Sequence, residues 1–406
     1  MYQCGVYRGA GDGVGMVPSL QGNNPYISLS TLLSISILSK IISIGTAVPP
    51  FAHQQDAILP FMQHIYALND EDRRKLKFLY HQSGIQTRYS VIPDYSRPAR
   101  EWKFYPPTEN LEPFPSLEQR MRWYRQYAAP LSLDAIRRCL TGKINTREVT
   151  HLITVSCTGM SAPGLDLELM ELIDLPKTVF RTSVNFMGCY AALHALKIAD
   201  AFCRADKGAK VLIVCTELCT LHFQQEPSTD NITSSLLFGD GSAAALVVGD
   251  DHIGKGVRID SFYSEIVTKG KKDMSWELSS TGFQMVLSSY IPDLIEEDFA
   301  ALVNRALEKN NSRMEAVRHW CIHPGGRKIL DSIQKSLHLA NGHLDMSYDV
   351  LKEYGNMSSP TILFVLQRIM DQLDYRQPDR IFGAAFGPGL TMETCMLVST
   401  NGEPHI

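Results

Sequence analysis

Three side chains that lie far apart in the sequence have the types that acyl transfer needs. Cys189 stands at the start of a helical stretch, His323 precedes a Pro-Gly-Gly turn, and Asn356 follows a glycine. A thiol, an imidazole and an amide can serve as a nucleophile, its base and a donor that stabilises an oxyanion. If the fold brings them together, the expected chemistry is transfer of an acyl group through a thioester.

Each of the three residues also has an ordinary structural interpretation. Most cysteines are buried and unreactive, and the other eight in this chain fit that description. Cys189 differs because Gly188 permits close approach of the backbone, and because the macrodipole of the following helix would favour a thiolate. A histidine can simply be packed or exposed, and an asparagine often caps a helix. The catalytic interpretation of His323 is favoured because a tight turn follows it and fixes its backbone. That of Asn356 is favoured because the two serines after it could cap the helix instead and leave its amide free to donate.

The elements that must position these residues alternate along the chain. Helical patterns separate short β-branched runs, which predicts an α/β fold with a largely buried sheet. Helices opened by Gly188-Cys189 and by Gly355-Asn356 hold equivalent places in two similar halves, so a pseudo-repeat could bring both sites to the centre. The predicted strands are 40–45, 151–155, 211–215, 243–248, 319–322, 380–384 and 393–398, and the predicted helices are 70–82, 116–141, 188–205, 296–309 and 358–373.

The bulk properties are those of an ordinary globular enzyme. The 406 residues predict an N-terminal extension at 1–35, an N-terminal half at 36–250 that carries the cysteine, and a C-terminal half at 251–406. A net charge of −4 offers no general attraction for nucleic acid. Nine scattered cysteines predict a reduced, cytoplasmic protein. The apolar segment 27–44 lacks the flanks of a signal peptide and the uncharged length of a membrane span.

Two further motifs could suggest a metal or a phosphate. Cys215, Cys219 and His222 lie close in sequence, but no fourth ligand stands nearby, which argues against zinc. The glycine-rich segment 382–390 lacks the Lys-Ser or Lys-Thr pair of a P-loop. Its three glycines and one proline instead predict tight backbone beside a cavity.

Together these motifs resemble the type III polyketide synthases, the chalcone and stilbene synthase-like family of the thiolase superfamily. The resemblance runs from about residue 40 to residue 400. It rests on the order of five motifs: GC at 188–189, LFGDG at 237–241, IHPGG at 322–326, YGNMSS at 354–359 and FGPG at 386–389. It implies a thiolase-like fold, in which two pseudo-repeated βα halves form a five-layer αβαβα core.

The resemblance also implies roles for the three residues. Cys189 would take a starter acyl group from CoA and hold the growing chain, while His323 would keep its sulfur ionised. His323 and Asn356 would stabilise the enolate formed when malonyl-CoA loses carbon dioxide, and this anion would attack the acyl group in a Claisen condensation. The product would then cyclise. The CoA thioesters are substrates, and the reaction is expected to need no cofactor and no metal.

The resemblance implies a substrate pocket that departs from the usual one. Phe238 and Phe283 match the two phenylalanines between the CoA tunnel and the cavity, and Ser358 keeps the small side chain beside the asparagine. Cys219 and His222 stand where cavity threonines are usual. The histidine should therefore narrow or polarise the pocket.

The expected grip on the CoA phosphates is also altered. Lys75 matches one of the family's basic residues, but Phe78 and Gln82 replace two others. The cations at positions 73, 74 and 77 could substitute. Glu217 matches a carboxylate that the family keeps near the site. These departures leave the starter and the product unassigned.

Two other classes of function remain open. One is a ketoacyl synthase III-like enzyme that makes a single condensation and takes malonyl from an acyl carrier protein. The other is a catalytically inactive thiolase-fold protein. The IHPGG and FGPG motifs favour the polyketide synthase, and the intact cysteine, histidine and asparagine argue against an inactive protein. The family forms homodimers, so we expect a homodimer here, with Ala162 where a neighbouring subunit's methionine often reaches into the cavity.

Overall fold

A nine-stranded mixed sheet organises the part of the chain that the computed structural model describes, residues 38–288 and 290–402. The strand order is β11-β12-β13-β8-β1-β7-β6-β4-β5. Strands β1 and β8 are joined by three residue pairs, so the sheet falls into two halves at this seam. The strands are β1 Ser39–Ala47, β4 His151–Ser156, β5 Phe180–Asn185, β6 Lys210–Leu218, β7 Asp240–Val248, β8 Gly256–Ile266, β11 Val317–Ile322, β12 Arg380–Gly387 and β13 Thr391–Thr400.

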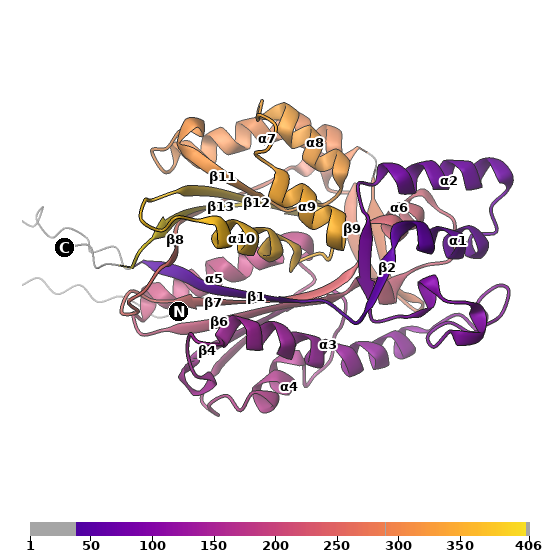
Figure 1. Ribbon diagram of the computed structural model, residues 1–406, viewed down its shortest axis with the longest axis horizontal. Coiled ribbons are helices and arrows are strands. Elements are labelled where there is room, and N and C mark those ends of the chain that lie inside the picture. The colour runs from indigo at the N-terminus through magenta and orange to yellow at the C-terminus, as the bar shows by residue number, and fades with distance from the viewer. Residues whose placement is uncertain (1–37, 289, 403–406) are drawn as a thin grey trace, which may run out of the picture. The chain divides into compact units, whose positions relative to one another are not determined.

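Helices cover the sheet halves to give five layers, as the thiolase-like fold requires (Figure 1). Helices α5 and α10 lie between the two halves, α3 and α4 cover the half that contains β1, and α7 and α8 cover the half that contains β11. The bounds are α3 Leu117–Leu140, α4 Leu165–Leu172, α5 Ala191–Ala205, α7 Ile291–Glu308, α8 Arg327–Ser336, α9 Asp345–Tyr354 and α10 Thr361–Gln372.

Both faces of the sheet are buried, which explains its almost continuous apolar strands. In β6, Leu212 and Val214 pack into the core shared with α3, whereas Val211 and Ile213 pack into the core shared with α5 and α10. This alternation follows from the two-residue period of a strand. The strand ends nearest to α5 and α10 are therefore rigidly positioned.

A smaller group of elements adjoins this sheet and supplies part of the pocket wall. Strands β2 and β3 pair antiparallel, as do β9 and β10, and α6 contacts β10. Helix α2 begins after Asn69, whose side chain accepts the backbone N–H of Asp72. The bounds are β2 Phe51–Gln54, α1 Gln55–Ile65, α2 Asp70–Gln82, β3 Thr87–Ser90, α6 Thr229–Leu237, β9 Met274–Ser279 and β10 Gly282–Leu287.

The predicted strands and helices are confirmed at the level of elements, with one error at a site residue. Helix α2 has the predicted bounds, and each predicted strand lies within an observed one. The helix predicted to open at Gly355-Asn356 begins instead at Thr361. The expected extension at 1–35 lies outside the described residues, and the division at residue 250 stays a prediction. None of the described helices has the length and apolar character needed to cross a membrane.

Candidate active site

Cys189 lies in a tight turn that joins the edge strand β5 to the central helix α5. The turn is a single 3₁₀ turn, Gly188–Tyr190, and α5 follows directly. Gly188 has φ of 76°, and a Cβ there would lie 2.3 Å from Cδ of Pro388. Only glycine fits a position with both a left-handed backbone and so close a neighbour. The predicted close approach at Gly188 is therefore confirmed, and it presents Cys189 half-buried at the head of the helix.

His323 follows strand β11 immediately and is held by its backbone. Its N–H donates to the carbonyl oxygen of Ala384 at 2.8 Å, which extends the pairing between β11 and β12. The side chain is 1% exposed, and neither ring nitrogen has a hydrogen-bond partner among the described residues. Burial lowers the pKa of this imidazole to about 3, so the ring is neutral and has both nitrogens available.

Asn356 belongs to a β-bridge with Phe238, not to a helix start. Its backbone N–H donates to the carbonyl oxygen of Leu237, and its own carbonyl accepts from Gly239, both at 2.9 Å. The carbonyl of Asn356, which would accept the first bond of a helix, is therefore already paired with Gly239, and the predicted helix start is wrong. Gly355 permits the turn, with φ of 69° and the Leu237 carbonyl close to where its Cβ would lie.

The side chain of Asn356 is oriented by its neighbours and faces the sulfur. Its Oδ1 accepts the backbone N–H of Ser358 at 2.8 Å, and its Nδ2 donates to the carbonyl oxygen of Gly325 at 3.3 Å. That Nδ2 lies 4.0 Å from Sγ of Cys189. An amide donor is therefore held beside the thiol by two hydrogen bonds to the backbone.

The surroundings of the Cys189 thiol oppose the ionised sulfur that the sequence predicts. Burial is the largest influence and raises its pKa to about 11. Hydrogen bonds from Ser358 and Asn356 act in the opposite direction, while the charge of Glu217 adds to the rise. Desolvation thus opposes the helix dipole, and the burial of His323 disfavours an imidazolium partner, so the ionised form of Cys189 stays a prediction.

A pocket of about 1220 Å³, a volume that includes the space at its mouth, unites these side chains. Cys189, His323 and Asn356 all line it. All but one of the other pocket residues inferred from the resemblance line it as well. They are Phe238, Phe283, His222, Cys219 and Ser358.

Lys75 is the exception. It does not line the pocket, and its side chain is exposed on α2. Its Nζ lies 2.8 Å from Oε1 of Glu71 and 3.3 Å from Oδ1 of Asp72. Both carboxylates raise the pKa of Lys75, that of Glu71 most strongly. The ammonium charge of Lys75 is therefore already shared with two carboxylates. Its role in phosphate binding stays a prediction.

His222 forms a rigid wall and does not present its nitrogens to the cavity. Its Nε2–H donates to the carbonyl oxygen of Thr158 at 2.8 Å, and its Nδ1 accepts the backbone N–H of Phe283 at 3.1 Å. The ring stacks on that of Phe283, with centroids 4.3 Å apart and planes 8° apart. Burial lowers the pKa of His222 to about 3. The side chain therefore contributes a flat apolar surface.

Sequence reasoning missed several residues of the pocket. Trp276 packs edge-on against His222 and donates its indole N–H to the carbonyl oxygen of Cys157 at 2.7 Å. Arg88, fully buried, donates to the carbonyl oxygens of Ser235 and Phe238 and so braces the Phe238 side of the pocket. The largely apolar run at 283–287 could have suggested the wall strand β10, but nothing local marks Arg88.

Glu217 is a buried carboxylate behind the thiol. It accepts hydrogen bonds from the backbone N–H of Cys157 and from the hydroxyls of Thr158 and Ser359, at 2.7–2.8 Å. Burial nevertheless raises its pKa to about 7. The network is complete without substrate, which fits a structural role. Among the described residues, no group of three or more His, Cys, Asp or Glu side chains could hold a metal ion.

Comparison with known proteins identifies the family. Residues 35–252 match the family model of the chalcone and stilbene synthases, N-terminal domain. Residues 258–401 match the family model of the C-terminal domain. The chain is 30% identical to the alpha-pyrone synthesis polyketide synthase-like Pks18 of Mycobacterium tuberculosis, over 80% of this chain and 82% of that protein. It is 29% identical to probable polyketide synthase 1 of Dictyostelium discoideum over 88% of its length, but spans 11% of that protein.

Solved structures agree with this assignment. PKS-I from the brown alga Ectocarpus siliculosus superimposes with a TM-score of 0.83 and 28% identity, over 89% of this chain and 98% of that one. The C-terminal type III polyketide synthase domain of Steely1, a type I/III hybrid from Dictyostelium, gives a TM-score of 0.80 at 28% identity, over 90% and 99%. The chain thus belongs to the chalcone and stilbene synthase family and is a type III polyketide synthase, an acyltransferase that condenses acyl-CoA substrates.

Proposed function

We propose that this enzyme loads an acyl-CoA starter on Cys189, extends it with malonyl-CoA by decarboxylative Claisen condensation, and cyclises the product. The observation that supports this most is the convergence of three groups in one pocket. An amide donor lies 4.0 Å from the thiol, and the same pocket contains an imidazole without hydrogen-bond partners in the described part of the chain.

Loading is an exchange of thioesters. The sulfur of Cys189 attacks the carbonyl carbon of the acyl-CoA, and the C–S bond to CoA breaks. Because burial disfavours both the thiolate and the imidazolium, His323 takes the thiol proton as the sulfur attacks and returns it to the departing CoA sulfur. Asn356 donates to the oxyanion that forms on the carbonyl oxygen.

Extension uses the same donors for a different anion. Malonyl-CoA loses carbon dioxide, and the electron pair of the broken C–C bond becomes an enolate on the thioester. Nδ2 of Asn356 and the N–H of His323 stabilise its oxygen. The enolate carbon attacks the acyl carbonyl on Cys189, and the C–S bond to Cys189 breaks. A β-ketoacyl-CoA is released, and the sulfur of Cys189 is free again. The apolar wall of Phe238 and Phe283 excludes water from the reactive anion.

No step requires a metal or a redox cofactor, and we propose that the enzyme uses none.

We also infer a homodimer. Strand β5 lies at the edge of the sheet, and its Phe180 is 55% exposed. An unpaired edge with exposed apolar side chains favours pairing with a second copy.

Eight described cysteines are free, which supports a reducing, cytoplasmic location.

The test is product analysis with a panel of aliphatic and aromatic acyl-CoA starters and malonyl-CoA, without carrier protein. We expect cyclised products that contain two or more malonyl-derived units, and an acyl adduct on Cys189 detected by mass spectrometry of the intact protein. The Cys189→Ala variant is the control and should show neither. A single-extension product from every starter would favour the ketoacyl synthase III-like alternative. Absence of product and of adduct with all starters would reject the proposal.

A further inference from the structure

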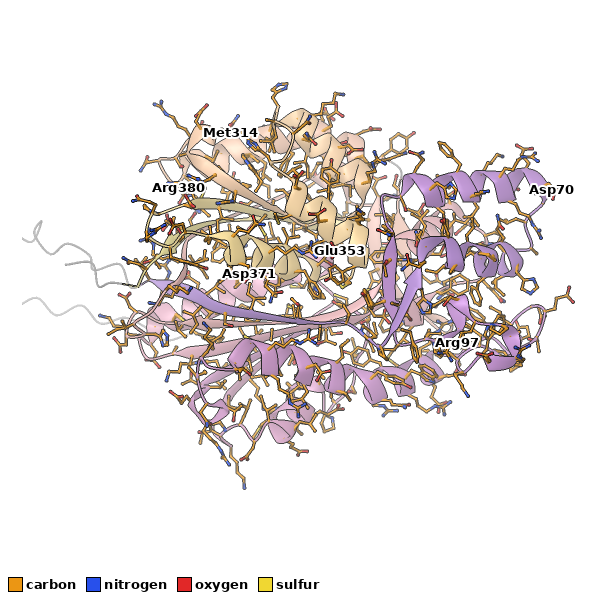
Figure 2. The ribbon with its side chains drawn as sticks, viewed as in Figure 1. Asp70, Arg97, Met314, Glu353, Asp371 and Arg380 are labelled. Carbon is orange, nitrogen blue, oxygen red and sulfur yellow. The ribbon has the colours of Figure 1, made fainter. Side chains whose placement is uncertain are left out.

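A guanidinium lies behind the pocket wall without an acid to neutralise it. Charged residues such as Asp70, Arg97 and Glu353 lie at the surface (Figure 2). Arg120, on the first turn of α3, is instead fully buried. Within residues 38–402 apart from 289, it has no carboxylate partner, and its Nη2 has no hydrogen-bond partner. A buried cation without an acid is costly, so its retention at this place calls for a reason.

Arg120 ties the start of α3 to the turn that carries His222. Its Nε donates to the carbonyl oxygen of Pro115 at 3.1 Å, and its Nη1 donates to the carbonyl oxygen of Leu221. Leu221 directly precedes His222 in a single 3₁₀ turn. The guanidinium carbon lies over the ring of Phe114, 5.0 Å from the ring centroid. Two carbonyl groups and an aromatic face therefore hold the guanidinium in one orientation.

The same side chain also meets the β9–β10 hairpin. A Cβ at Gly282, the first residue of β10, would lie 3.0 Å from Cδ and from Nε of Arg120. Gly282 has φ of 125°, a conformation that favours glycine. Next to this contact, the backbone N–H of Leu117 donates to the carbonyl oxygen of Ser280 at 3.2 Å. The start of α3 therefore joins the hairpin to the turn that carries His222, and Arg120 contacts both.

His222 and Phe283 are the wall residues that these two segments bring together. The backbone N–H of Phe283 donates to Nδ1 of His222, and the two rings stack. Accepting this bond requires a neutral imidazole with its proton on Nε2. Burial is the main cause of the low pKa of His222, and the charge of Arg120 lowers this pKa further. Arg120 thus favours both the placement and the protonation state on which the contact depends.

We propose that Arg120 is a positioning residue that fixes the wall of His222 and Phe283 and thereby controls how many times the chain is extended. Arg120 does not line the pocket, so it acts through that wall and not on the reacting atoms. The inference rests on the proposed function, because a wall selects chain length only if the pocket holds a growing chain. Chains that differ by about one methylene are discriminated in such pockets, so a small displacement of the wall is enough.

A space-filling role alone would need neither the charge nor the fork of an arginine. An apolar side chain of similar length would fill the same volume without the cost of desolvating a cation. The rigid fork of a guanidinium reaches the carbonyl oxygens of Pro115 and Leu221 at once, while its plane lies on a ring. The ammonium of a lysine is a point donor, so it could keep the charge but only part of this geometry.

The experiment replaces Arg120 in the full-length protein and follows chain length and loading separately. Arg120→Met removes the charge and the donors, whereas Arg120→Lys keeps the charge. With the best starter of the panel and malonyl-CoA, Arg120→Met should change the share of at least one chain length about twofold or more, and Arg120→Lys should lie closer to the parent. Acylation of Cys189, measured by intact mass, should change less than about threefold in both variants, because His323 still handles the thiol proton.

Gly282→Ala disturbs the same contact from the side of β10 and leaves Arg120 in place. It should change the shares of the same products, and its effect should not add to that of Arg120→Met, because both act on one contact. Should Arg120→Met fail to fold, Arg120→Lys and its combination with Gly282→Ala provide the same comparison. Arg122→Met is the matched control: Arg122 is exposed on the same helix, paired with Glu118 at 3.0 Å and outside the pocket lining, so neither loading nor products should change.

Three outcomes would overturn the inference. Arg120→Met could fold, as judged by circular dichroism, and give the product pattern of the parent. Loading, turnover and resistance to urea could all fall together with an unchanged product pattern, which would assign Arg120 a general structural role. The effects of Arg120→Met and Gly282→Ala could be additive, which would separate the two segments. A failure of the proposed function would look different, because the parent enzyme itself would then form neither product nor an adduct on Cys189.

Discussion

Two buried histidines in the same pocket differ in what their nitrogens can do. Burial lowers the pKa of both His222 and His323 to about 3. Both nitrogens of His222 are engaged, by Thr158 and by the backbone of Phe283. Neither nitrogen of His323 has a partner among the described residues. Burial thus sets the protonation state of both rings, but the hydrogen-bond partners decide which ring can move a proton.

An unpaired buried nitrogen is costly, which makes the environment of His323 informative. Leaving a buried polar group without a partner costs about 1–3 kcal/mol. Such groups in native structures call for a reason, and a functional site is a common one. His222 incurs no such cost and instead stiffens the wall that supports Phe283. The following predictions test this contrast, and they run from the largest expected effect to the smallest.

Replacing each histidine by glutamine should separate the two roles. His323→Gln should lower kcat for condensation by about 10²–10⁴, the usual contribution of a general acid–base. His222→Gln should lower it by less than about tenfold, because that ring only shapes the wall. Release of CoA measures the rate, and circular dichroism checks that both variants fold. Equal losses in the two variants would remove the distinction.

Asn356→Ala should affect the enolate more than the loading step. Loss of the Nδ2 donor should slow decarboxylation of malonyl-CoA by about 10²–10³, the range found when one oxyanion donor is removed. Acylation of Cys189 should slow less than about tenfold, because His323 still handles the thiol proton. Carbon dioxide release measures the first step, and intact mass measures the second. A larger loss in acylation than in decarboxylation would contradict the assignment.

The raised pKa of the Cys189 thiol predicts a steep pH dependence of alkylation. The thiolate is the reactive form, and the pKa of Cys189 is raised to about 11, so its fraction increases with pH throughout the accessible range. Between pH 7 and pH 9 the rate of reaction with iodoacetamide in the free protein should rise about a hundredfold. Peptide mapping should place the label on Cys189 before Cys157, whose pKa burial raises well above the usual value.

The opposite result would be equally clear. A rate that is flat between pH 6 and pH 8 would mean that His323 holds the sulfur as a thiolate–imidazolium pair. In that case the sharing of charge within the pair, and not the burial of each group alone, would control the protonation state. His323→Gln should then restore the steep dependence.

His222→Thr should change the product more than the rate. The variant removes the acceptor for the backbone N–H of Phe283 and the ring stacked on it, which should lower the free energy of unfolding by about 1–3 kcal/mol. The wider cavity should shift the distribution of chain lengths, with less than about a tenfold change in turnover. Mass spectrometry and urea unfolding measure the two effects. Cys219→Thr, also in the wall, is the control, and an unchanged product pattern in His222→Thr would exclude His222 as a size determinant.

Local pattern was sufficient to predict most of the large elements. The β-branched runs predicted the strands because both faces of the sheet are buried. Helix α2 has the predicted bounds, and the side chain of Asn69 caps its start. The start of α7 was placed too late, at Glu296 instead of Ile291. Pro292 fits in the first turn of α7, where its missing N–H is not needed.

Contacts between distant segments explain what the pattern could not predict. The backbone of Asn356 pairs with that of Phe238, so local helix signals in the serines and proline that follow were overridden. Trp276 and Arg88 enter the pocket wall only because the β9–β10 hairpin packs beside α6 and Arg88 of strand β3 donates to the carbonyl oxygen of Ser235 on α6. No short-range feature of either residue marks it as part of a site.

The amino-acid sequence by itself determined the three reactive groups, their order along the chain, and the alternation of strands and helices that carries them. Only the tertiary structure decided the charge of each group and which nitrogens are available for reaction. The physical reason is that desolvation and hydrogen bonding depend on whatever surrounds a side chain, and around Cys189, His222 and His323 those surroundings come from segments far away in the sequence.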